Sequence, residues 1–475
     1  MACKCGKKKD CKCSELLYIT NPNCGWCKKA DPVVDELINK GYKITKLDIT
    51  KPEDAKRANE VKTKHNVQCG TPLFIDVKSG NMVCGFRQDV LEKWANGEDI
   101  PAPPPRSKQQ PNTPQVIHAK LDYVWLDGNS PKKLRSKTHY ELIETAELKR
   151  QQDFISKIPV VSFDGSSTNQ ANVKDSDLLL KPVKFVINPM DSYHDPSKGS
   201  VCYIVLCEVL NGDGTHHKTN TRRILQESME KNKKHEMIFG IEQEYVIIDE
   251  ETHLPVGWNQ YENNTPKPQG DYYCGVGADN VKLRNFTDEH ANVCNKMNIR
   301  VVGSHAEVMP GQWEYQLKPY SPLEAADNLW LSRYILCRMS ESANMSISFE
   351  PKPMEGDWNG SAAHINFSTK EMRENPNIEL MNVLCSSMDK YHKDAIQCYG
   401  GGNERRLTGS HETSSIDNFT WDQSNRTVSI RIPVRGLDVG YMEDRRPAAN
   451  MDPYEAINHL LNSVCEITEE MLVTT

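Results

Sequence analysis

A proline-rich stretch constrains this chain most, because it divides the 475 residues into two parts that must fold separately. Between Asp99 and Pro114, prolines stand at positions 101, 103, 104, 105, 111 and 114. Proline has no backbone N–H to complete a helix or a sheet, and it favours an extended polyproline-type chain. We therefore predict a semi-rigid linker over residues 99–114. At roughly 150 residues per domain, the length favours about three domains in all.

The part before the linker alternates strand-like and helix-like segments. Strands are predicted at 16–20, 42–49, 73–77 and 82–86, and helices at 28–39, 52–65 and 89–94. In the first helix, Val33, Val34, Leu37 and Ile38 share one face. The order strand, helix, strand, helix, strand, strand, helix is typical of a small α/β sandwich, which we place at residues 15–98.

Two cysteines separated by two residues, Cys24 and Cys27, lie where the first strand meets the first helix. A helix N-terminus stabilises a thiolate, so we expect Cys24 to be a nucleophile and Cys27 its resolving thiol. The same spacing also occurs as half of a zinc site. Gly70-Thr71-Pro72 resembles the Thr-cis-Pro segment that faces the cysteine pair in thioredoxins and glutaredoxins. The module resembles that superfamily, which implies thiol–disulfide oxidoreductase activity with a thiol reductant or disulfide partner.

Residues 1–14 form a Lys-rich tail that contains Cys3, Cys5, Cys11 and Cys13. Four soft thiolates so close together suit Zn²⁺ or Cu⁺. The alternative is a solvated tail that binds no metal. The sequence leaves both interpretations open.

Composition restricts the partners and the compartment. The formal net charge of −7 argues against a protein that follows nucleic-acid phosphates. The tail has no apolar signal-peptide core, and no later run approaches the ~18 apolar residues of a membrane helix. We therefore expect a cytoplasmic protein with neither a membrane nor a nucleic-acid partner. In that reducing compartment most of the 16 cysteines should be reduced.

After the linker, the predicted secondary-structure pattern changes once, near residue 215. Residues 115–215 carry short strand-like runs at 119–125, 184–187 and 200–209, which predict a small, mostly β domain. From 216 to 475, helix-like segments at 224–233, 323–344 and 379–396 alternate with acidic or Arg-bearing strands. This second pattern is typical of a larger α+β domain. The fold class is therefore multidomain α+β.

Acidic residues in the larger domain suggest metal-assisted chemistry. Glu242 and Glu244 stand two apart in an apolar strand, so both carboxylates leave the same face. Two glutamates with this spacing more often lie on the solvent-exposed face of a strand than in a site. Further acidic and histidine residues, at Glu307, Glu314 and His364, favour a site instead. Activating a carboxyl group with ATP requires divalent metal, cations for the phosphates and a proton acceptor.

Ordered motifs from about Val116 to the C-terminus resemble the glutamine synthetase family in its shorter eukaryotic-type form. These motifs occupy residues 164–168, 242–244, 268–279, 304–315, 359–366, 405–414, 425–433 and 440–447. The resemblance implies a β-grasp domain at 115–215 and a catalytic domain at 216–475. One departure is Ser304-His305, which stands where the family commonly has Thr-Asn or Ser-Asn.

The resemblance implies two or three divalent ions. One would be held beside the substrate by Glu244, Glu307 and Glu314. Another would be held on the nucleotide phosphates by Glu242, His364 and Glu443. Carboxylate oxygens with one imidazole suit Mg²⁺ or Mn²⁺.

The resemblance also implies roles for charged and polar residues. Arg406 and Arg445 would bind glutamate beside Asn359 and Gly360. Arg426 and Arg431 would contact ATP and the transferring phosphate, where a guanidinium fork binds better than lysine. Asp164 would deprotonate ammonium, and Glu412 would shield the reaction from water.

The implied reaction joins ammonia to L-glutamate at the expense of ATP, through γ-glutamyl phosphate. The implied assembly is a homo-oligomer, a decamer of stacked rings with sites between neighbouring subunits. One alternative is a ligase of the same family that uses another amine. The other is an oligomer with a redox or structural role and an inactive ligase half.

Overall fold

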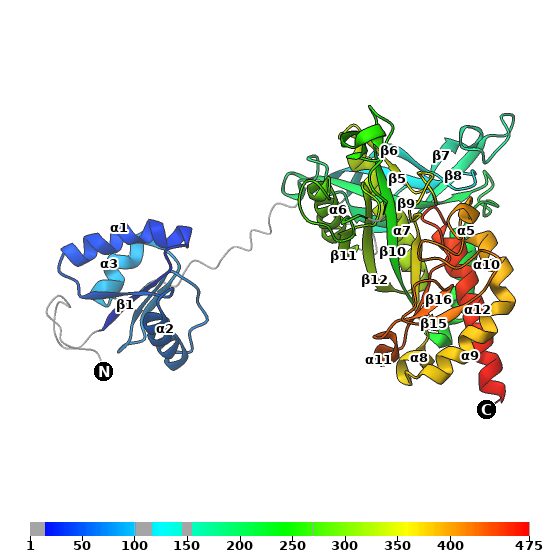
Figure 1. Cartoon of the computed structure of the whole chain (residues 1–475). Coiled ribbons are helices and arrows are strands. Elements are labelled where there is room, and N and C mark those ends of the chain that lie inside the picture. The colour runs from blue at the N-terminus through cyan, green and yellow to red at the C-terminus, as the bar shows by residue number, and fades with distance from the viewer. Residues whose placement is uncertain (1–14, 99, 101–115, 145–153, 269, 475) are drawn as a thin grey trace. The chain divides into compact units, whose positions relative to one another are not determined.

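The computed structural model describes residues 15–98, 100, 116–144, 154–268 and 270–474. The chain forms two compact units, Met1–Asn112 and Thr113–Thr475, and each is considered by itself (Figure 1). The predicted cysteine-rich tail, and the predicted linker apart from Ile100, lie outside the described residues.

The first unit has a four-stranded sheet in the order β2-β1-β3-β4. Its elements are β1 (Leu16–Thr20), α1 (Gly25–Asn39), β2 (Ile44–Asp48), α2 (Pro52–Lys64), β3 (Leu73–Asp76), β4 (Met82–Cys84) and α3 (Gln88–Asn96). The predicted order of strands and helices is confirmed. β1 is parallel to β2 and antiparallel to β3.

Alternating side chains of β1 build two cores, one on each face of this sheet. Leu16 and Tyr18 pack with residues of α1 and α3, such as Val34 and Trp94. Leu17 and Ile19 pack on the opposite face with Ala58 and Val61 of α2. Two helices therefore cover one face and one helix covers the other, which makes a three-layer α/β/α sandwich (Figure 1).

The second unit begins with a five-stranded sheet in the order β6-β5-β9-β8-β7. Its strands are β5 (Val116–Leu126), β6 (Leu134–Glu144), β7 (Val161–Asp164), β8 (Asp177–Ile187) and β9 (Ser200–Leu210). β5 and β9 pair in parallel at the centre, and all the other neighbours are antiparallel. The expectation of a mostly β domain is confirmed.

A larger sheet follows, in the order β11-β12-β10-β14-β17-β16-β15, with β13 also paired to β10. Its strands are β10 (Ile238–Asp249), β11 (Val301–Ala306), β12 (Gln312–Tyr320), β13 (Met345–Ser348), β14 (Ala363–Ser368), β15 (Trp421–Gln423), β16 (Ile430–Ile432) and β17 (Met442–Asp444). Phe239, Ile241 and Tyr245 of β10 join the main core. The residues between them, Glu242 and Glu244, therefore face the other side of the sheet.

Helices pack against the core side of this sheet. They are α5 (Thr221–Lys231), α6 (Arg284–Lys296), α7 (Pro322–Glu341), α8 (Lys370–Glu374), α9 (Ile378–Met388), α10 (His392–Cys398), α11 (Gly436–Val439) and α12 (Pro453–Thr474). The prediction of one helix over 379–396 is wrong, because a short 3₁₀ turn, Asp389–Tyr391, separates α9 from α10. None of the helices in the described part of the chain has the length and apolar character needed to cross a bilayer.

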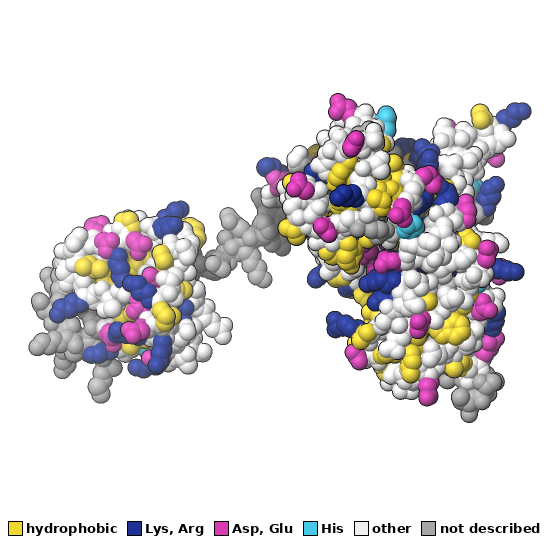
Figure 2. Space-filling model, viewed as in Figure 1, with side chains coloured by type: hydrophobic (Ala, Val, Ile, Leu, Met, Phe, Trp, Pro, Cys, Tyr) yellow, Lys and Arg dark blue, Asp and Glu magenta, His cyan; other side chains and the backbone are white. Residues whose placement is uncertain are grey.

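A buried polar clamp fixes β10 in the middle of the sheet. The Arg333 guanidinium of α7 donates two hydrogen bonds, of 2.8 and 2.7 Å, to Oε1 of Gln243. The same guanidinium donates to the backbone oxygens of Ala449 and Met451. Gln243 lies between the two glutamates, so these hydrogen bonds hold the strand segment that carries both carboxylates. On the face drawn in Figure 2, acidic and basic side chains are interspersed over both units.

Candidate active site

A polar cavity of about 490 Å³ opens on the side of the large sheet away from the helices. The site residues predicted from the sequence that line it are Glu242, Glu244, Glu307, Glu314, Asn359, Gly360, His364, Arg406, Glu412, Arg426, Arg431 and Arg445. Glu443 is buried directly beside it and contacts two of these arginines. The structure thus gathers residues from segments far apart in the sequence.

Strand register explains how the acidic residues meet. Glu244 of β10 stands opposite Glu314 of β12, and Glu242 stands opposite His364 of β14. Oε2 of Glu244 accepts hydrogen bonds from the Gln312 side chain and from the backbone N–H of Ala362, at 2.9 and 3.1 Å. Oε1 of Glu242 accepts one from Asn366, at 2.7 Å.

The protein alone does not supply enough nearby positive charge to keep the carboxylates of the cavity ionised. Burial raises the pKa of Glu242 to about 7 and that of Glu244 to about 8, and the Glu314 carboxylate adds to both shifts. Burial and the same neighbour hold the pKa of Glu307 well above its usual range. A divalent cation would restore the ionised forms, because it compensates for lost hydration and mutual repulsion.

The donor set fits Mg²⁺ or Mn²⁺. One possible ligand atom from each of Glu242, Glu314 and His364 lies within 4.8 Å of the others. Burial, with repulsion from nearby arginines, lowers the pKa of His364 well below its usual range. The imidazole is therefore neutral and able to act as a ligand.

Four arginines also line the cavity and are called its arginine wall: Arg406, Arg426, Arg431 and Arg445. Glu443 accepts a hydrogen bond of 2.8 Å from Arg431 and one of 2.7 Å from Arg445. Nε of Arg431 is buried without a hydrogen-bond partner. Burial lowers the pKa of Arg406 to about 10, so its guanidinium is still ionised at neutral pH. Clustered guanidinium groups with a free donor suit a phosphate or carboxylate ligand.

A loop carrying Asn359 and Gly360 borders the cavity. The Asn359 amide lies 3.5 Å from the Glu412 carboxylate. A Cβ atom at Gly360 would come within 2.3 Å of the Pro351 carbonyl oxygen and 2.6 Å of Arg406 Cγ. Only glycine therefore allows this loop to lie so close to the arginine.

His305 lines the same cavity, although no role was predicted for it from the sequence. Its Nδ1 is 3.3 Å from Glu307 Oε1, and its Nε2 is 3.2 Å from Glu314 Oε1. The hydrogen bond with Glu314 raises the pKa of His305. The only sequence signal was its departure from the family's usual asparagine.

Asp164 is not among the residues that line this cavity. It ends β7 and caps a short 3₁₀ helix, Gly165–Thr168. Hydrogen bonds from the Ser166 and Ser167 hydroxyls and from the Ser166 N–H lower its pKa to about 2. Its exposed carboxylate is therefore ionised at neutral pH.

Cys24 and Cys27 lie in the first unit, where Cys24 is the N-cap residue directly before α1. Hydrogen bonds from the Cys27 N–H and thiol lower the pKa of Cys24. Its Sγ is 3.5 Å from the carbonyl oxygen of Thr71, and the Thr71-Pro72 peptide bond is cis. Cys27 is buried.

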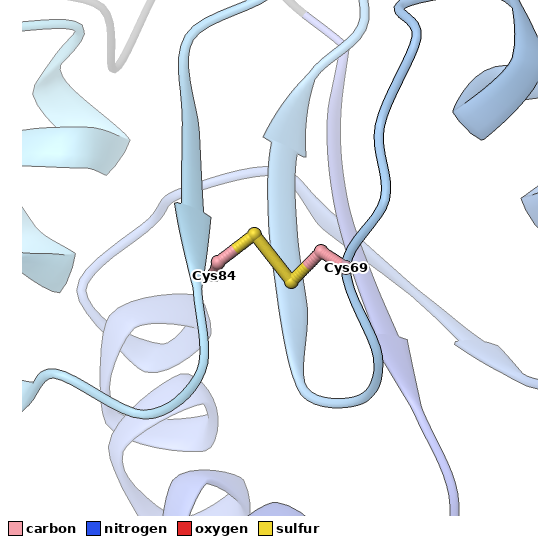
Figure 3. The surroundings of a disulfide bond; sticks show 2 residues. All are labelled: Cys69 and Cys84. Carbon is pink, nitrogen blue, oxygen red and sulfur yellow. A yellow bond between two sulfur atoms is a disulfide. The ribbon is translucent and has the colours of Figure 1, made fainter. Parts of the chain in front are cut away.

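A disulfide joins Cys69 and Cys84 in this unit (Figure 3). The pair is an exception to the expectation that most cysteines are reduced. The bond connects the segment before Thr71 to β4, whose Cys84 pairs with Leu73 of β3. Sequence reasoning missed it because the two cysteines are 15 residues apart and meet only through sheet pairing.

Comparison with known proteins matches the second unit to one family. The model of the glutamine synthetase β-grasp domain matches residues 118–212, and that of the glutamine synthetase catalytic domain matches residues 218–392. A glutamine synthetase of Streptomyces viridochromogenes is 43% identical over 356 residues, which cover 74% of this chain and 98% of that protein. Those of Colletotrichum gloeosporioides and Neurospora crassa are each 41% identical, covering 72% and 74% of this chain and 91% and 93% of their own lengths.

The matched segments contain the five-stranded sheet and most of the acidic half of the cavity. The β-grasp and catalytic domains expected after the linker are therefore present as members of that family. The relatives are matched over almost their whole length, so the similarity is not limited to one motif. This chain belongs to the glutamine synthetase family.

Proposed function

We propose that the chain catalyses ATP-dependent ligation of ammonia to L-glutamate, giving glutamine, ADP and phosphate. The observation that carries the proposal is the cavity itself, where desolvated carboxylates face buried arginines. That arrangement attracts cations to one wall and anions to the other. A reaction between ATP, a carboxylate and ammonium needs both.

The carboxylates of the cavity would bind divalent metal, Mg²⁺ or Mn²⁺, which would supply charge neutralisation for the phosphates. Glu244, Glu307 and Glu314 would hold one ion, assigned to the glutamate side of the site. Glu242, His364 and Glu443 would hold another, assigned to the nucleotide. Raised pKa values of Glu242 and Glu244 support these roles, because only a nearby cation lets them ionise fully at neutral pH.

The arginine wall binds the two anionic reactants. Arg406 and Arg445 orient glutamate beside Asn359 and Gly360. Arg426 and Arg431 contact the nucleotide and the transferring phosphoryl group, and the free Nε of Arg431 is one donor for it. Phosphoryl transfer to the side-chain carboxylate then gives γ-glutamyl phosphate, the species that ammonia attacks.

Two further carboxylates handle ammonium and water. Glu412 lines the cavity next to Asn359, and its proposed role is to keep water from the acyl phosphate. Asp164, whose exposed carboxylate is ionised at neutral pH, binds ammonium and accepts its proton. Because Asp164 lies outside the cavity of its own chain, we propose that it serves a neighbouring subunit in a ring-shaped homo-oligomer, a decamer.

For the first unit we propose thiol–disulfide exchange at Cys24 and Cys27, on a thioredoxin-like fold. The lowered pKa of Cys24, its N-cap position before α1 and its contact with the Thr71 carbonyl oxygen support this proposal. Reduction of insulin disulfides by the full chain should disappear in Cys24→Ser. It should persist in Cys274→Ser, which alters an exposed free cysteine of the other unit. Equal activity in both variants would reject Cys24 as the nucleophile.

An amine panel tests the ligase and separates it from the two alternatives. ADP release from the purified chain with Mg²⁺ and glutamate should depend on ammonium, with little release from ethanolamine or polyamines. Preference for another amine would make the chain a related ligase. No amine-dependent release at all, with reductant or without, would indicate an inactive ligase half.

A further inference from the structure

We propose that His305 is a nitrogen ligand of the divalent cation held by Glu307 and Glu314, and that it shifts this site from Mg²⁺ towards Mn²⁺. The proposal rests on the proposed ligase function, because it concerns the same cavity. It differs from the ligand sets implied by family resemblance, which give this ion carboxylate ligands only.

Strand pairing places the imidazole among the acidic residues. His305 of β11 stands directly opposite Glu314 of β12, and Glu307 follows the end of β11. One possible ligand atom from each of these three residues lies within 4.8 Å of the others. Two further hydrogen bonds orient the Glu314 and Glu307 carboxylates. The Gln316 side chain donates one of 2.8 Å to Glu314 Oε1, and the Val308 N–H donates one to Glu307 Oε2.

The neighbours of the two ring nitrogens indicate which one carries the proton. Nδ1 is 3.3 Å from the carbonyl oxygen of Ala306 and 3.3 Å from Glu307 Oε1. A backbone carbonyl can only accept a hydrogen bond, so Nδ1 is the donor and carries the proton in the neutral ring. Nε2, which is 3.2 Å from Glu314 Oε1, is then the nitrogen that can serve as a metal ligand.

A lone pair on Nε2 and one on Glu314 Oε1 can both be donated to a divalent cation that lies between them. The 3.2 Å separation of these two atoms fits this, since two adjacent ligands about 2.1 Å from an octahedral ion are about 3 Å apart. The hydrogen on Nδ1 at the same time points to a carboxylate and a carbonyl. This is the usual environment of a metal-bound histidine, whose second nitrogen is oriented by an oxygen acceptor.

The ligand type sets the expected selectivity. Mg²⁺ takes oxygen ligands almost exclusively, whereas transition metals accept imidazole readily. An asparagine at this position would offer only a weak amide oxygen. His305 should therefore increase affinity for Mn²⁺ more than affinity for Mg²⁺.

Pulsed electron paramagnetic resonance on the full chain with Mn²⁺ alone tests the coordination. His364 could supply nitrogen at the second ion, so the test uses the His364→Asn variant as its background. We expect nitrogen coupling to bound Mn²⁺ to persist in His364→Asn and to vanish when His305→Asn is added. Absence of coupling in His364→Asn loaded with Mn²⁺ would overturn the proposal.

Calorimetric titration in the otherwise wild-type chain is a second test that does not depend on the first variant. His305→Asn should weaken Mn²⁺ binding by about tenfold or more, with a smaller loss for Mg²⁺. His411→Asn, which changes another histidine of the cavity wall, should leave Mn²⁺ affinity within about twofold. Unchanged Mn²⁺ affinity in His305→Asn would overturn the proposal. Glutamine formation by the wild-type chain, measured separately, distinguishes this outcome from failure of the proposed ligase function.

Discussion

The clustered carboxylates of the cavity lower the stability of the metal-free protein. Glu244 is buried beside Glu314, and the pKa of Glu244 is raised to about 8 by burial and by that neighbour. Such a group binds a proton in the folded metal-free protein at pH values where an unfolded glutamate is ionised. Metal binding must displace this proton before the carboxylate becomes a ligand.

This displacement predicts how pH affects stability and metal binding. Because the folded-state pKa is raised, the folded chain holds more protons than the unfolded chain from about pH 4.5 to about 8, and metal-free stability falls as pH rises through that window. Mg²⁺ or Mn²⁺ removes this loss. The metal-induced rise in melting temperature should therefore be larger at pH 8 than at pH 6.5.

Differential scanning fluorimetry across this range measures the effect. Apparent metal affinity should increase up to about tenfold per pH unit for each proton displaced. In Glu244→Gln the pH dependence should shrink, since one titrating ligand is gone. A metal-induced rise that is the same at both pH values in the wild-type chain would contradict the raised pKa values.

Most of the residues that line the cavity were predicted from the sequence. The order of the family motifs along the chain identifies these residues, although the numbers of residues between the motifs do not. It did not predict the role of His305. A lone histidine after a serine has no distinctive pattern, and its contacts with Glu307 and Glu314 exist only because β11 pairs with β12. A role that depends on which residues face each other on paired strands cannot be predicted before the strand register is known.

Among the elements, the strongly patterned segments were predicted, but some edge elements of the second unit were not. β6 (Leu134–Glu144) alternates weakly and is largely exposed, because it lies at the end of its sheet and is stabilised by pairing with β5. The 3₁₀ turn between α9 and α10 also lacks a Gly or Pro signal. Pairing and packing, rather than local propensity, decide such segments.

One turn that positions Glu443 gives a prediction at this scale. Gly440 joins α11 to β17 with φ of +77°, and a Cβ there would lie 2.0 Å from the Met372 carbonyl oxygen. Gly440→Ala should lower stability by about 2–4 kcal/mol, because it combines a strained backbone with a steric clash. Thermal unfolding of the full chain should show a clearly lower midpoint.

Gly401→Ala is the matched control for this substitution. A Cβ at Gly401 would approach nothing closer than Pro131 Cδ at 4.0 Å, and its φ is not in the left-handed region. Its melting temperature should stay near that of the wild-type chain. Equal midpoints for the two variants would mean that the turn tolerates a side chain and that β17 is not held in this way.

At the scale of the whole molecule, the ligase site is incomplete within one chain if Asp164 is the ammonium base. Asp164 belongs to the five-stranded sheet, whereas Arg445 and the acidic wall belong to the larger one. A head-to-tail ring brings different surfaces of adjacent subunits together. Two inactive variants should therefore complement each other.

Mixing Asp164→Ala with Arg445→Ala subunits tests this arrangement. Each variant alone should be nearly inactive, since one lacks the base and the other a glutamate-binding arginine. Dissociation and random reassembly of an equal mixture should restore about a quarter of wild-type activity, one half times one half. Hetero-oligomers, verified by mass spectrometry, that regain no activity would show that each site is built within one chain.

If this chain makes glutamine through an acyl phosphate, an oxygen atom of the glutamate side chain must pass to the released phosphate. The full-length chain is incubated with Mg²⁺, ATP, ammonium and glutamate labelled with ¹⁸O in its side-chain carboxylate. Phosphorus NMR should detect one ¹⁸O in the released phosphate for each glutamine formed, because the carboxylate oxygen stays with the phosphoryl group when ammonia displaces it. Glutamine formed together with unlabelled phosphate, or phosphate released without glutamine, would contradict the account.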